Sequence, residues 1–493
     1  MIYKQNCTQL KWLKLSIYYN AETMNGIKTQ DSFRDHLATV TTEGKRKWIF
    51  PKKPSGRFYN ARTIFSIFLI LFLVIVPFIK VKGHPFLLFD FPNRNFILLS
   101  VPFGPHDFHL FALAIIALAV FIILFTVIFG RVFCGWACPQ TVFMEMVFRK
   151  IEYLIEGDFK EQMKLNQAPW TSNKLFKKTI KHVIFFLIAF FISNIFLSYI
   201  TGMDELKKIV TAPPSKHLAG FISMLAFSGA FYWIFSYFRE QVCTLVCPYG
   251  RLQGVLLDQD SIVIAYDNVR GEPRGRLKKN ESRDKHGDCI DCYLCVDVCP
   301  TGIDIRNGIQ LECVNCTACI DACDTVMDKI DRPRGLIRYD SLRGIERKEK
   351  FRFTQRMALY STILVLIISV LSYLLITRSD FSINILRTPG LLFQEQPNDK
   401  YSNIYDLNII NKTFNPAPIQ LKLKDIDGEL KLLGDEISLK PQEKRDSKFM
   451  LILPKSSISK MNTQITISVY SNDKLLKEVK TSFLGPVTAK GNS

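Results

Sequence analysis

The chain has 493 residues, which is more than one ordinary domain needs, so two or three domains are expected. Its formal net charge is +19, yet 48% of its residues are hydrophobic, and the charged and apolar stretches are segregated along the chain. Many Lys and Arg residues flank the apolar runs, as in membrane proteins, so the positive charge does not indicate nucleic acid as a partner.

The N-terminal 61 residues are polar and basic and are expected to form a cytoplasmic tail. No apolar stretch followed by a small-residue cleavage site precedes the first long apolar run, so a secretory signal peptide is not expected. Cys7 is the single cysteine of this tail and is interpreted as an ordinary thiol.

Five apolar runs are long enough to cross a lipid bilayer as helices, which takes about 20 residues. The predicted membrane helices are 62–80, 110–131, 181–201, 218–238 and 357–376. The stretch 86–101 is also apolar, but polar residues and a proline interrupt it. We therefore expect that stretch at the membrane interface and not across the membrane.

The distribution of basic residues predicts the orientation. Lys and Arg are frequent in the tail, in the loop 132–180 and in the segment 239–356, but few occur at 81–109 and 202–217. Because basic loops stay on the cytoplasmic side, the tail and the segment 239–356 are expected in the cytoplasm. Five membrane crossings then place residues 380–493 in the periplasm.

The region 380–493 has the sequence pattern of an all-β domain. Apolar and polar residues alternate at 419–423 and 465–469, and the turn pairs Asp427-Gly428 and Asn472-Asp473 separate such runs. Short alternating strands with frequent turns predict an immunoglobulin-like β-sandwich. The region contains no cysteine, so neither disulfides nor a thiolate metal site are expected in it.

Eight of the thirteen cysteines lie in two short runs, CIDCYLCVDVCP at 289–300 and CVNCTACIDACD at 313–324. Each run has the spacing C-x2-C-x2-C-x3-C, in which three thiolates bind one 4Fe–4S cluster and the fourth binds the neighbouring cluster. The expected ligands of cluster 1 are Cys289, Cys292, Cys295 and Cys323, and those of cluster 2 are Cys313, Cys316, Cys319 and Cys299. Residues 251–350 are thus predicted to form a cytoplasmic two-cluster ferredoxin-type domain.

Zinc is the main alternative for these runs, because zinc also binds pairs of cysteines. A zinc site uses four thiolates, usually as two separated pairs. It does not explain why each run continues with further cysteines after its first pair. Disulfides are not expected on the reducing side of a membrane. A pair of iron–sulfur clusters transfers single electrons, so an electron carrier is predicted.

The region 62–250 is predicted to hold four membrane helices in two hairpins, and each hairpin ends in CxxxCP. The cysteines of these motifs are Cys134 and Cys138, then Cys243 and Cys247. The repeated spacing favours a function over simple packing of small side chains. Four soft thiolates suit Cu(I) or a further cluster, and the spacing leaves both open.

Several other polar residues are interpreted as structural. The stretch 141–155 has an amphipathic pattern suited to the membrane surface, so Glu145 and Glu152 are expected to be solvated. His106 and His109 precede the second membrane helix and are interpreted as cap or interface residues in preference to metal ligands. A surface turn is expected for the arginine-rich segment, with Arg270, Arg274 and Arg276.

The sequence resembles the CcoG/FixG (RdxA) family of cytochrome c oxidase accessory proteins. The resemblance covers about residues 83–345, and the tail at 1–45 has no counterpart in it. The matching stretches are GHPFLLFDFPNR (83–94), GRVFCGWACPQTVF (130–143), REQVCTLVCPYGRLQ (239–253), RGEPRG (270–275), the two cysteine runs (287–324) and PRGLIRY (333–339). A C-terminal immunoglobulin-like domain is also a feature of the family.

The resemblance implies a multi-pass ferredoxin of the bacterial inner membrane that helps to assemble cbb-type oxidase. The proposed chemistry is reduction of Cu(II) to Cu(I), so the chain would be a cupric reductase with Cys134, Cys138, Cys243 and Cys247 at the reaction site. Implied partners are membrane lipid and the oxidase assembly machinery or copper chaperones. The identity of the electron donor and the formation of a homodimer are left open.

Two other functions remain open. One is an electron conduit from quinol to an extracytoplasmic reductase, as in the related NapH and NosR proteins, but the ends of those proteins differ from the ends of this chain. The other is a scaffold in which the clusters only brace the fold. The latter predicts clusters that cannot be reduced and reoxidised reversibly.

Overall fold

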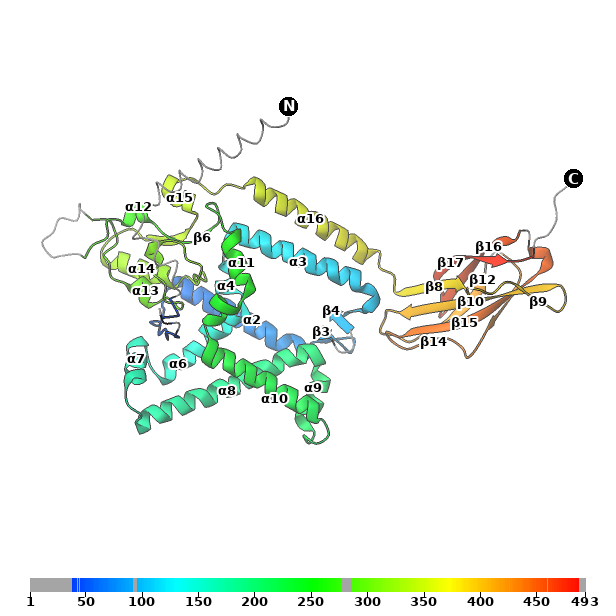
Figure 1. Cartoon of the computed structure of the whole chain (residues 1–493), viewed down its shortest axis with the longest axis horizontal. Coiled ribbons are helices and arrows are strands. Elements are labelled where there is room, and N and C mark those ends of the chain that lie inside the picture. Colours follow the sequence, from blue (N-terminus) through cyan, green and yellow to red (C-terminus); the bar gives the residue numbers. More distant parts are fainter. Residues whose placement is uncertain are drawn as a thin grey trace, which may run out of the picture. The chain divides into compact units, whose positions relative to one another are not determined.

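The computed structural model describes residues 38–41, 43, 45–91, 95–276, 286–424, 426–458 and 460–486 (Figure 1). The lone thiol predicted at Cys7 lies outside the described residues. The chain divides into two compact units, which are considered separately. The unit that we call the cysteine-rich unit comprises Met1–Val76, Ile116–Ser198 and Asp204–Leu366, and the β unit comprises Pro77–Ile115, Tyr199–Met203 and Ile367–Ser493.

The five predicted membrane helices are confirmed as helices that are long and apolar enough to cross a membrane. They are Arg57–Phe78 (α2 with η2), Phe108–Phe129 (α3), Ser172–Thr201 (α8), Leu218–Phe238 (α10 with η5) and Gln355–Ile376 (α16). Helix α8 begins earlier than predicted, because the basic residues before its apolar run are helical as well. Apolar side chains on these helices are exposed over much of their length, as suits contact with lipid tails.

Short elements connect the membrane helices of the cysteine-rich unit. They are α4 (Val132–Trp136), α5 (Pro139–Thr141), η4 (Val142–Phe148), α6 (Arg149–Ile155), α7 (Phe159–Gln167), α9 (Met203–Thr211), which begins in the β unit, η5 (Ile234–Phe238), η6 (Val242–Val246) and α11 (Pro248–Leu256). The elements η4, η5 and η6 are π-helical. Single π-helical turns inside helices are frequent at functional sites, and here they flank both CxxxCP motifs.

The two cysteine runs lie in a small α/β region that follows α11. It consists of β6 (Val263–Tyr266), α12 (Asn268–Gly271), α13 (Leu294–Asp297), η8 (Ile305–Asn307), α14 (Ala318–Lys329), β7 (Ile337–Asp340) and α15 (Leu342–Arg347). Strands β6 and β7 pair antiparallel, with Val263 opposite Asp340. A core that includes Ile264, Ile320 and Met327 joins the strands to the cysteine loops.

The stretch 141–155 is not a helix with a solvated polar face. Its side chains are buried on several sides, and they include Phe143, Phe148 and Arg149. The expectation of solvated carboxylates is wrong for Glu152, which is 3% exposed and bonded to Arg239 at 2.6 Å. Burial alone would raise the pKa of Glu152, but the charge and hydrogen bonds of Arg239, together with the charges of Lys181 and Arg149, outweigh burial and lower the pKa to about 2. The helical periodicity of the sequence indicated a polar face on this stretch. It could not show that charged side chains from other segments cover that face.

The apolar stretch at 86–101 forms strands and not a membrane helix, in agreement with the prediction. The β unit contains β1 (Lys80–Val81), β2 (His84–Pro85), β3 (Leu87–Asp90), β4 (Asn95–Leu98), β5 (Val101–Phe103) and η3 (Pro105–Asp107). Strands β3, β4 and β5 form an antiparallel sheet, and the ring of His84 stacks on Phe414 with 3.7 Å between ring centroids.

The C-terminal part of the β unit is the predicted β-sandwich. Its strands are β8 (Phe381–Arg387), β9 (Gln394–Gln396), β10 (Lys400–Asn411), β11 (Ala417–Pro418), β12 (Gln420–Leu423), β13 (Glu429–Leu432), β14 (Ser438–Leu439), β15 (Lys444–Pro454), β16 (Asn462–Ser471) and β17 (Lys474–Leu484). One sheet has the order β13-β15-β10-β8 with β9 beside β10, and another has the order β12-β16-β17. The predicted turn Asn472-Asp473 joins β16 to β17 with positive φ at both residues.

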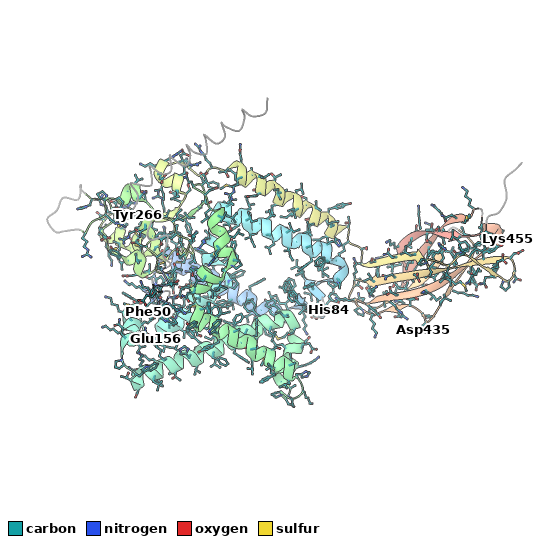
Figure 2. The ribbon with its side chains drawn as sticks, viewed as in Figure 1. Phe50, His84, Glu156, Tyr266, Asp435 and Lys455 are labelled. Carbon is teal, nitrogen blue, oxygen red and sulfur yellow. The ribbon has the colours of Figure 1, made fainter. Side chains whose placement is uncertain are left out.

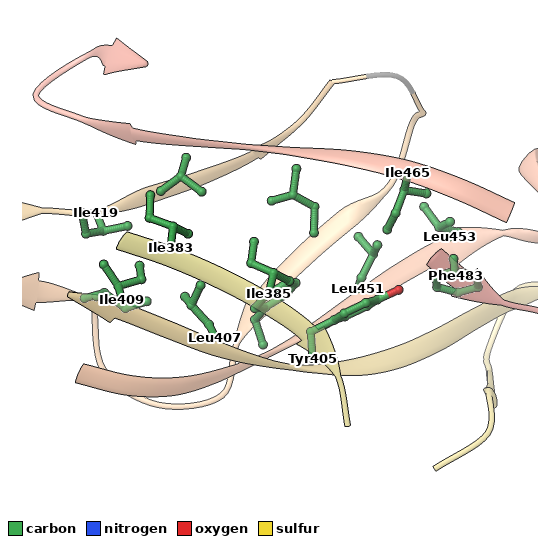
Figure 3. Packing of buried hydrophobic residues seen from close by; sticks show 14 of the residues in the cluster. Ile383, Ile385, Tyr405, Leu407, Ile409, Ile419, Leu451, Leu453, Ile465 and Phe483 are labelled. Atoms are coloured by element: carbon green, nitrogen blue, oxygen red, sulfur yellow. The ribbon is translucent and has the colours of Figure 1, made fainter. Parts of the chain in front are cut away.

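The core of the sandwich consists of aliphatic and aromatic side chains from both sheets (Figure 3). Tyr405 on β10 and Phe449 on β15 are paired in register, and their rings stack with centroids 5.2 Å apart. Ile465 and Phe483 contribute from the other sheet. Burial alternates along β10 from Asn403 to Ile409, as a period of two requires, whereas all residues at 465–469 of β16 are buried, including Thr466 and Ser468.

Candidate functional site

The first cysteine run and one cysteine of the second run surround a common space. Cys289, Cys292 and Cys295 lie before and within α13, and Cys323 lies on α14. All four line one cavity, together with Tyr266 and other side chains. Figure 2 labels Tyr266 and so marks this part of the chain. Cys289 and Cys295 are buried, whereas Cys292 is exposed. The structure therefore brings together the four residues that the spacing assigned to cluster 1.

The other four cysteines also lie near one another. The charge of the Cys299 thiolate acts on Cys313, Cys316 and Cys319, although Cys299 belongs to the first run. Cys316 is buried, and Cys313 packs in the same core as Cys319. The exchange of the fourth cysteine between the two runs is thus present in the fold.

Both cysteine loops have the same unusual backbone. The residue two positions after the first cysteine has positive φ in each loop, 52° at Asp291 and 53° at Asn315. The residue after the second cysteine also does, 59° at Tyr293 and 67° at Thr317. Residues other than glycine rarely adopt this backbone conformation. Where they do, the surrounding structure enforces it, commonly at ligand sites.

The chemistry of these donors fits iron–sulfur clusters. Burial raises the pKa of the thiols of Cys295, Cys313 and Cys323 to about 12 and that of Cys316 to about 11. Buried thiols without metal are therefore protonated, and cluster binding must displace those protons. Thiolates are the usual cluster ligands, and a cavity lined by four of them has the donor set of a cubane.

The two CxxxCP motifs have matching geometry. Cys138 and Cys247 each occupy the N-cap position, and a proline follows at the start of the next helix, α5 or α11. The amide of Cys138 donates to the carbonyl of Phe133 at 2.9 Å, and the amide of Cys247 donates to Val242 at 2.8 Å. The repeat seen in the sequence is therefore repeated in the backbone.

The thiols of the two motifs are close enough to influence one another. Burial and, to a smaller extent, the charges of Cys138, Cys134 and Cys247 together raise the pKa of Cys243 to about 12. Burial likewise raises the pKa of Cys134 to about 11, against a hydrogen bond with buried Gln253 at 3.4 Å. In the described part of the chain, no three His, Cys, Asp or Glu side chains form a group that could hold a single metal ion.

The membrane thiols lie against the second cysteine set. Cys134 and Cys243 pack on a small core that contains Val314 and Cys316. Gly135, between the two cysteines of the first motif, approaches the Val314 and Asn315 carbonyls so closely that an added Cβ would overlap them. The sequence did not predict this contact, because it joins segments about 180 residues apart.

Polar side chains fasten the same contact. The indole of Trp136 donates to the Tyr339 hydroxyl at 3.1 Å, and that hydroxyl donates to the carbonyl of Asn315 at 3.3 Å. The Arg62 guanidinium donates to the carbonyls of Gly135 at 2.7 Å and Cys316 at 3.4 Å. Trp136 could have been singled out by its place inside the motif, but Arg62 stands alone at the edge of an apolar run.

The arginine-rich turn belongs to the surroundings of the first cysteine set. The amide of Gly275 donates to the carbonyl of Cys289 at 3.1 Å, and Arg270 pairs with Asp288 at 2.5 Å. Of the two histidines before the second membrane helix, His109 is exposed, and the side chain of His106 lies outside the described residues. The prediction that these histidines are not ligands is therefore untested.

Family models match three parts of the chain. A 4Fe-4S dicluster domain model matches residues 238–342, and a 4Fe-4S binding domain model matches residues 111–159. A model of the IG-like fold at the C-terminal of FixG matches residues 371–486. These matches confirm the ferredoxin-type and immunoglobulin-like parts of the prediction.

Relatives match over most of the chain. Protein RdxB of Cereibacter sphaeroides is 34% identical over 413 residues, which cover 80% of this chain and 86% of RdxB. Protein RdxA of the same organism is 35% identical over 381 residues, with 74% and 79% covered. The nitrogen fixation protein FixG of Rhizobium meliloti is 32% identical over 330 residues, with 66% and 61% covered.

A solved structure matches the C-terminal part. The crystal structure of a FixG-related protein from Vibrio parahaemolyticus is 21% identical, covers 22% of this chain and 97% of that chain, and has a TM-score of 0.19. The relatives in the preceding paragraph carry the family assignment. The chain thus belongs to the family of RdxA, RdxB and FixG proteins and is a 4Fe–4S electron-transfer protein.

Proposed function

We propose that this chain assists the assembly of cbb-type cytochrome c oxidase by reducing Cu(II) to Cu(I) at its membrane thiols. The observation that carries the proposal is the packing of Cys134 and Cys243 against the core that contains Cys316. Clusters bound by the two cysteine sets supply single electrons, and the reduction of one Cu(II) ion consumes one electron. No proton and no second substrate is needed for this balance.

The residues of the chain have separate parts in this reaction. Cys289, Cys292, Cys295 and Cys323 would hold cluster 1, and Cys299, Cys313, Cys316 and Cys319 would hold cluster 2. Cys134, Cys138, Cys243 and Cys247 would bind the copper substrate, because thiolates favour Cu(I) over Cu(II). Gly135 and Arg62 keep the first motif in contact with the loop of the second set.

The orientation is part of the proposal. The basic residues at 132–180 and 239–356 favour the cytoplasmic side for both cysteine sets, and hence the periplasm for the β-sandwich. Copper would then be reduced at the inner face of the bacterial membrane. Cysteine labelling of intact cells at single introduced cysteines tests this: Ser447→Cys should react with a membrane-impermeant reagent, and Glu346→Cys, at an exposed position, should react only after lysis.

A second candidate for the membrane thiols is a further iron–sulfur cluster. It is favoured by the match of the 4Fe-4S binding domain model to 111–159, which contains Cys134 and Cys138. Either purpose would require the four thiols to come closer together, because in the described structure no three of them form a group that could hold one metal ion. The two candidates differ in the iron content of the purified protein, about eight atoms per chain for two cubanes and about twelve for three.

The experiment compares the wild type with a variant in which all four membrane cysteines are serine. Both are purified anaerobically, analysed for iron, sulfide and copper, reduced, and mixed with Cu(II) and a Cu(I)-specific chelator. We expect the variant to keep about eight iron atoms per chain and to lose Cu(I) formation. Cys7→Ser is the matched control and should behave as the wild type. Unchanged Cu(I) formation in the fourfold variant would refute the site assignment.

A further inference from the structure

The two cysteine sets differ in the buried charges beside them. At the first set, Arg306 is 8% exposed, and its guanidinium lies over the ring of Tyr293 at 4.1 Å. It pairs with Asp291 at 2.6 Å and with Asp304 at 2.7 Å. Two carboxylates thus neutralise the positive charge at the place where it is buried.

At the second set, two arginines are buried without such neutralisation. Arg62 is 3% exposed and donates to the carbonyls of Gly135 and Cys316. Arg131 is 5% exposed and donates to the carbonyls of Leu311 and Gly250. Among the described residues, no carboxylate forms an ion pair with either guanidinium.

The nearest competing charge has a partner of its own. The carboxylate of Glu145 also acts on Cys316, but it pairs with Arg149 at 3.0 Å. Carbonyl oxygens accept from Nε and Nη1 of Arg62 and from Nη1 and Nη2 of Arg131, but they do not cancel the charge. Nη2 of Arg62 and Nε of Arg131 are buried without a hydrogen-bond partner in the described structure.

Carboxylates in and beside the second run are buried as well, among them Glu312 and Asp321, and Asp321 accepts from the amides of Phe58 and Tyr59. At Cys316, the charge of Arg62, whose guanidinium donates to the carbonyl of that residue, acts more strongly than the charge of any carboxylate.

A positive charge that dominates in this way changes the equilibrium of electron transfer. A cluster gains one negative charge on reduction, so a nearby buried cation stabilises its reduced form and raises its reduction potential. The effect is strong where water is excluded, as it is around Arg62. The first set lacks a net cation of this kind, and its Cys292 is open to solvent, which screens charge.

We propose that Arg62 and Arg131 hold the reduction potential of the second cluster above that of the first, so that electrons collect beside the membrane thiols. The proposal rests on the proposed function only in taking both cysteine sets to bind electron-carrying clusters. One electron leaves the first cluster and one enters the second, with no bond made or broken. Arg62 and Arg131 are positioning residues in this step, since they do not touch the copper substrate.

The test is a redox titration of the full-length protein followed by electron paramagnetic resonance. The wild type should show two waves. In Arg62→Gln and in Arg131→Gln the higher-potential wave should move to lower potential and the other should stay. Arg62→Lys keeps the positive charge but lacks the several N–H donors of the guanidinium group. The higher-potential wave of this variant should therefore move less than that of Arg62→Gln. Arg306→Gln leaves Asp291 and Asp304 unneutralised, so it should lower the other wave.

Two outcomes would overturn the proposal. One is an unmoved higher wave in both Gln variants with iron and sulfide contents equal to those of the wild type. The other is a response of the higher wave to Arg306→Gln. Should both Gln variants lose iron, Cys292→Ser in the otherwise wild-type chain decides: loss of the lower wave supports the order, and loss of the higher wave refutes it.

These outcomes are separate from the fate of the copper proposal. The titration needs no copper, so a protein that failed to reduce Cu(II) could still show the expected order of potentials. Conversely, a protein that reduced Cu(II) could show the opposite order. Zinc in place of iron would remove both waves and refute the two proposals together.

Discussion

The cysteine-rich unit and the β-sandwich bury different kinds of side chain. The sandwich is closed by aliphatic and aromatic groups such as Tyr405, Phe449 and Phe483, and it contains no cysteine (Figure 3). The cysteine-rich unit buries thiols together with charged groups such as Arg149 and Glu156. Apolar burial stabilises a fold by itself, whereas buried thiols and charges stabilise it only with their partners.

The two parts therefore differ in the source of their stability. The order of the sandwich follows from its own sequence pattern. The cysteine loops have four residues in the strained positive-φ conformation, and their thiols surround a space that a cofactor would fill. We therefore expect the two parts to respond to opposite treatments.

The largest effect is expected from removing iron. Chelation under reducing conditions should unfold the loops at 289–323, because binding of the cofactor then no longer offsets the cost of their backbone conformation. Hydrogen exchange of the full chain should show lost protection in α14 and kept protection in β10, β15 and β16. Equal loss in both parts would contradict the comparison.

A cavity in the sandwich core should destabilise the sandwich and leave the cysteine loops unchanged. Phe449 is fully buried, so Phe449→Ala should cost about 3–5 kcal/mol in the free energy of unfolding of the sandwich. Hydrogen exchange in β10 and β15 measures this cost, and the iron content per chain should not change. Leu475→Ala, at an exposed position of β17, is the matched control and should have little effect.

A smaller effect is expected from a strongly paired buried acid of the β unit. Asp107 is 2% exposed and accepts from Arg378 and Lys412, both at 2.8 Å. Burial opposes its ionisation, but the bonds with Arg378 and Lys412 prevail and lower the pKa of Asp107. Asp107→Asn should therefore cost about 1.5–3 kcal/mol at neutral pH.

The pH dependence has a definite sign. Because the pKa is lowered in the folded state, the contribution of Asp107 is fully present above its unfolded value of about 3.9. It is lost as the pH falls through the lower folded value. Urea unfolding of the wild type and Asp107→Asn should show a stability difference at pH 7 that shrinks below pH ~4. A difference independent of pH would contradict the assignment.

The smallest change in stability is expected at the contact between the first motif and the second cysteine set. Gly135→Ala places a methyl group against two backbone carbonyls that cannot rotate away, at a cost of about 1–3 kcal/mol. Cu(I) formation should fall by about tenfold or more, since small misplacements at reacting groups are costly. Gly229→Ala, with no atom near its added methyl group, is the control and should reduce copper normally.

The sequence predicts the elements whose pattern is local. The five membrane helices follow from runs of apolar residues, and the strands β12 and β16 follow from alternation at 419–423 and 465–469. The cysteine spacing also predicted which residues the fold brings together, including the exchange of Cys299 and Cys323. These features depend on residues that are neighbours in the chain or on a motif with fixed geometry.

The rest depends on contacts between distant segments. Nothing in the apolar run after residue 62 indicates that Arg62 reaches the carbonyl of Cys316, 254 positions away. The burial of Glu152 was missed for the same reason, because its partner Arg239 belongs to the other hairpin. The sequence can identify charged residues beside a motif as candidates for a functional role. It cannot predict whether an oppositely charged side chain from a distant segment pairs with them.

The two cysteine sets differ in their exposure to solvent, and this difference predicts how the protein responds to air. The sulfur of Cys292 is reachable from solvent, while the second set is enclosed by the membrane motifs and by Tyr339. Dissolved oxygen and peroxide attack iron–sulfur centres from their open side. Handling without anaerobic precautions should therefore strip the outer centre first and leave a half-loaded chain that still holds iron next to the lipid but has lost its connection to any soluble reductant.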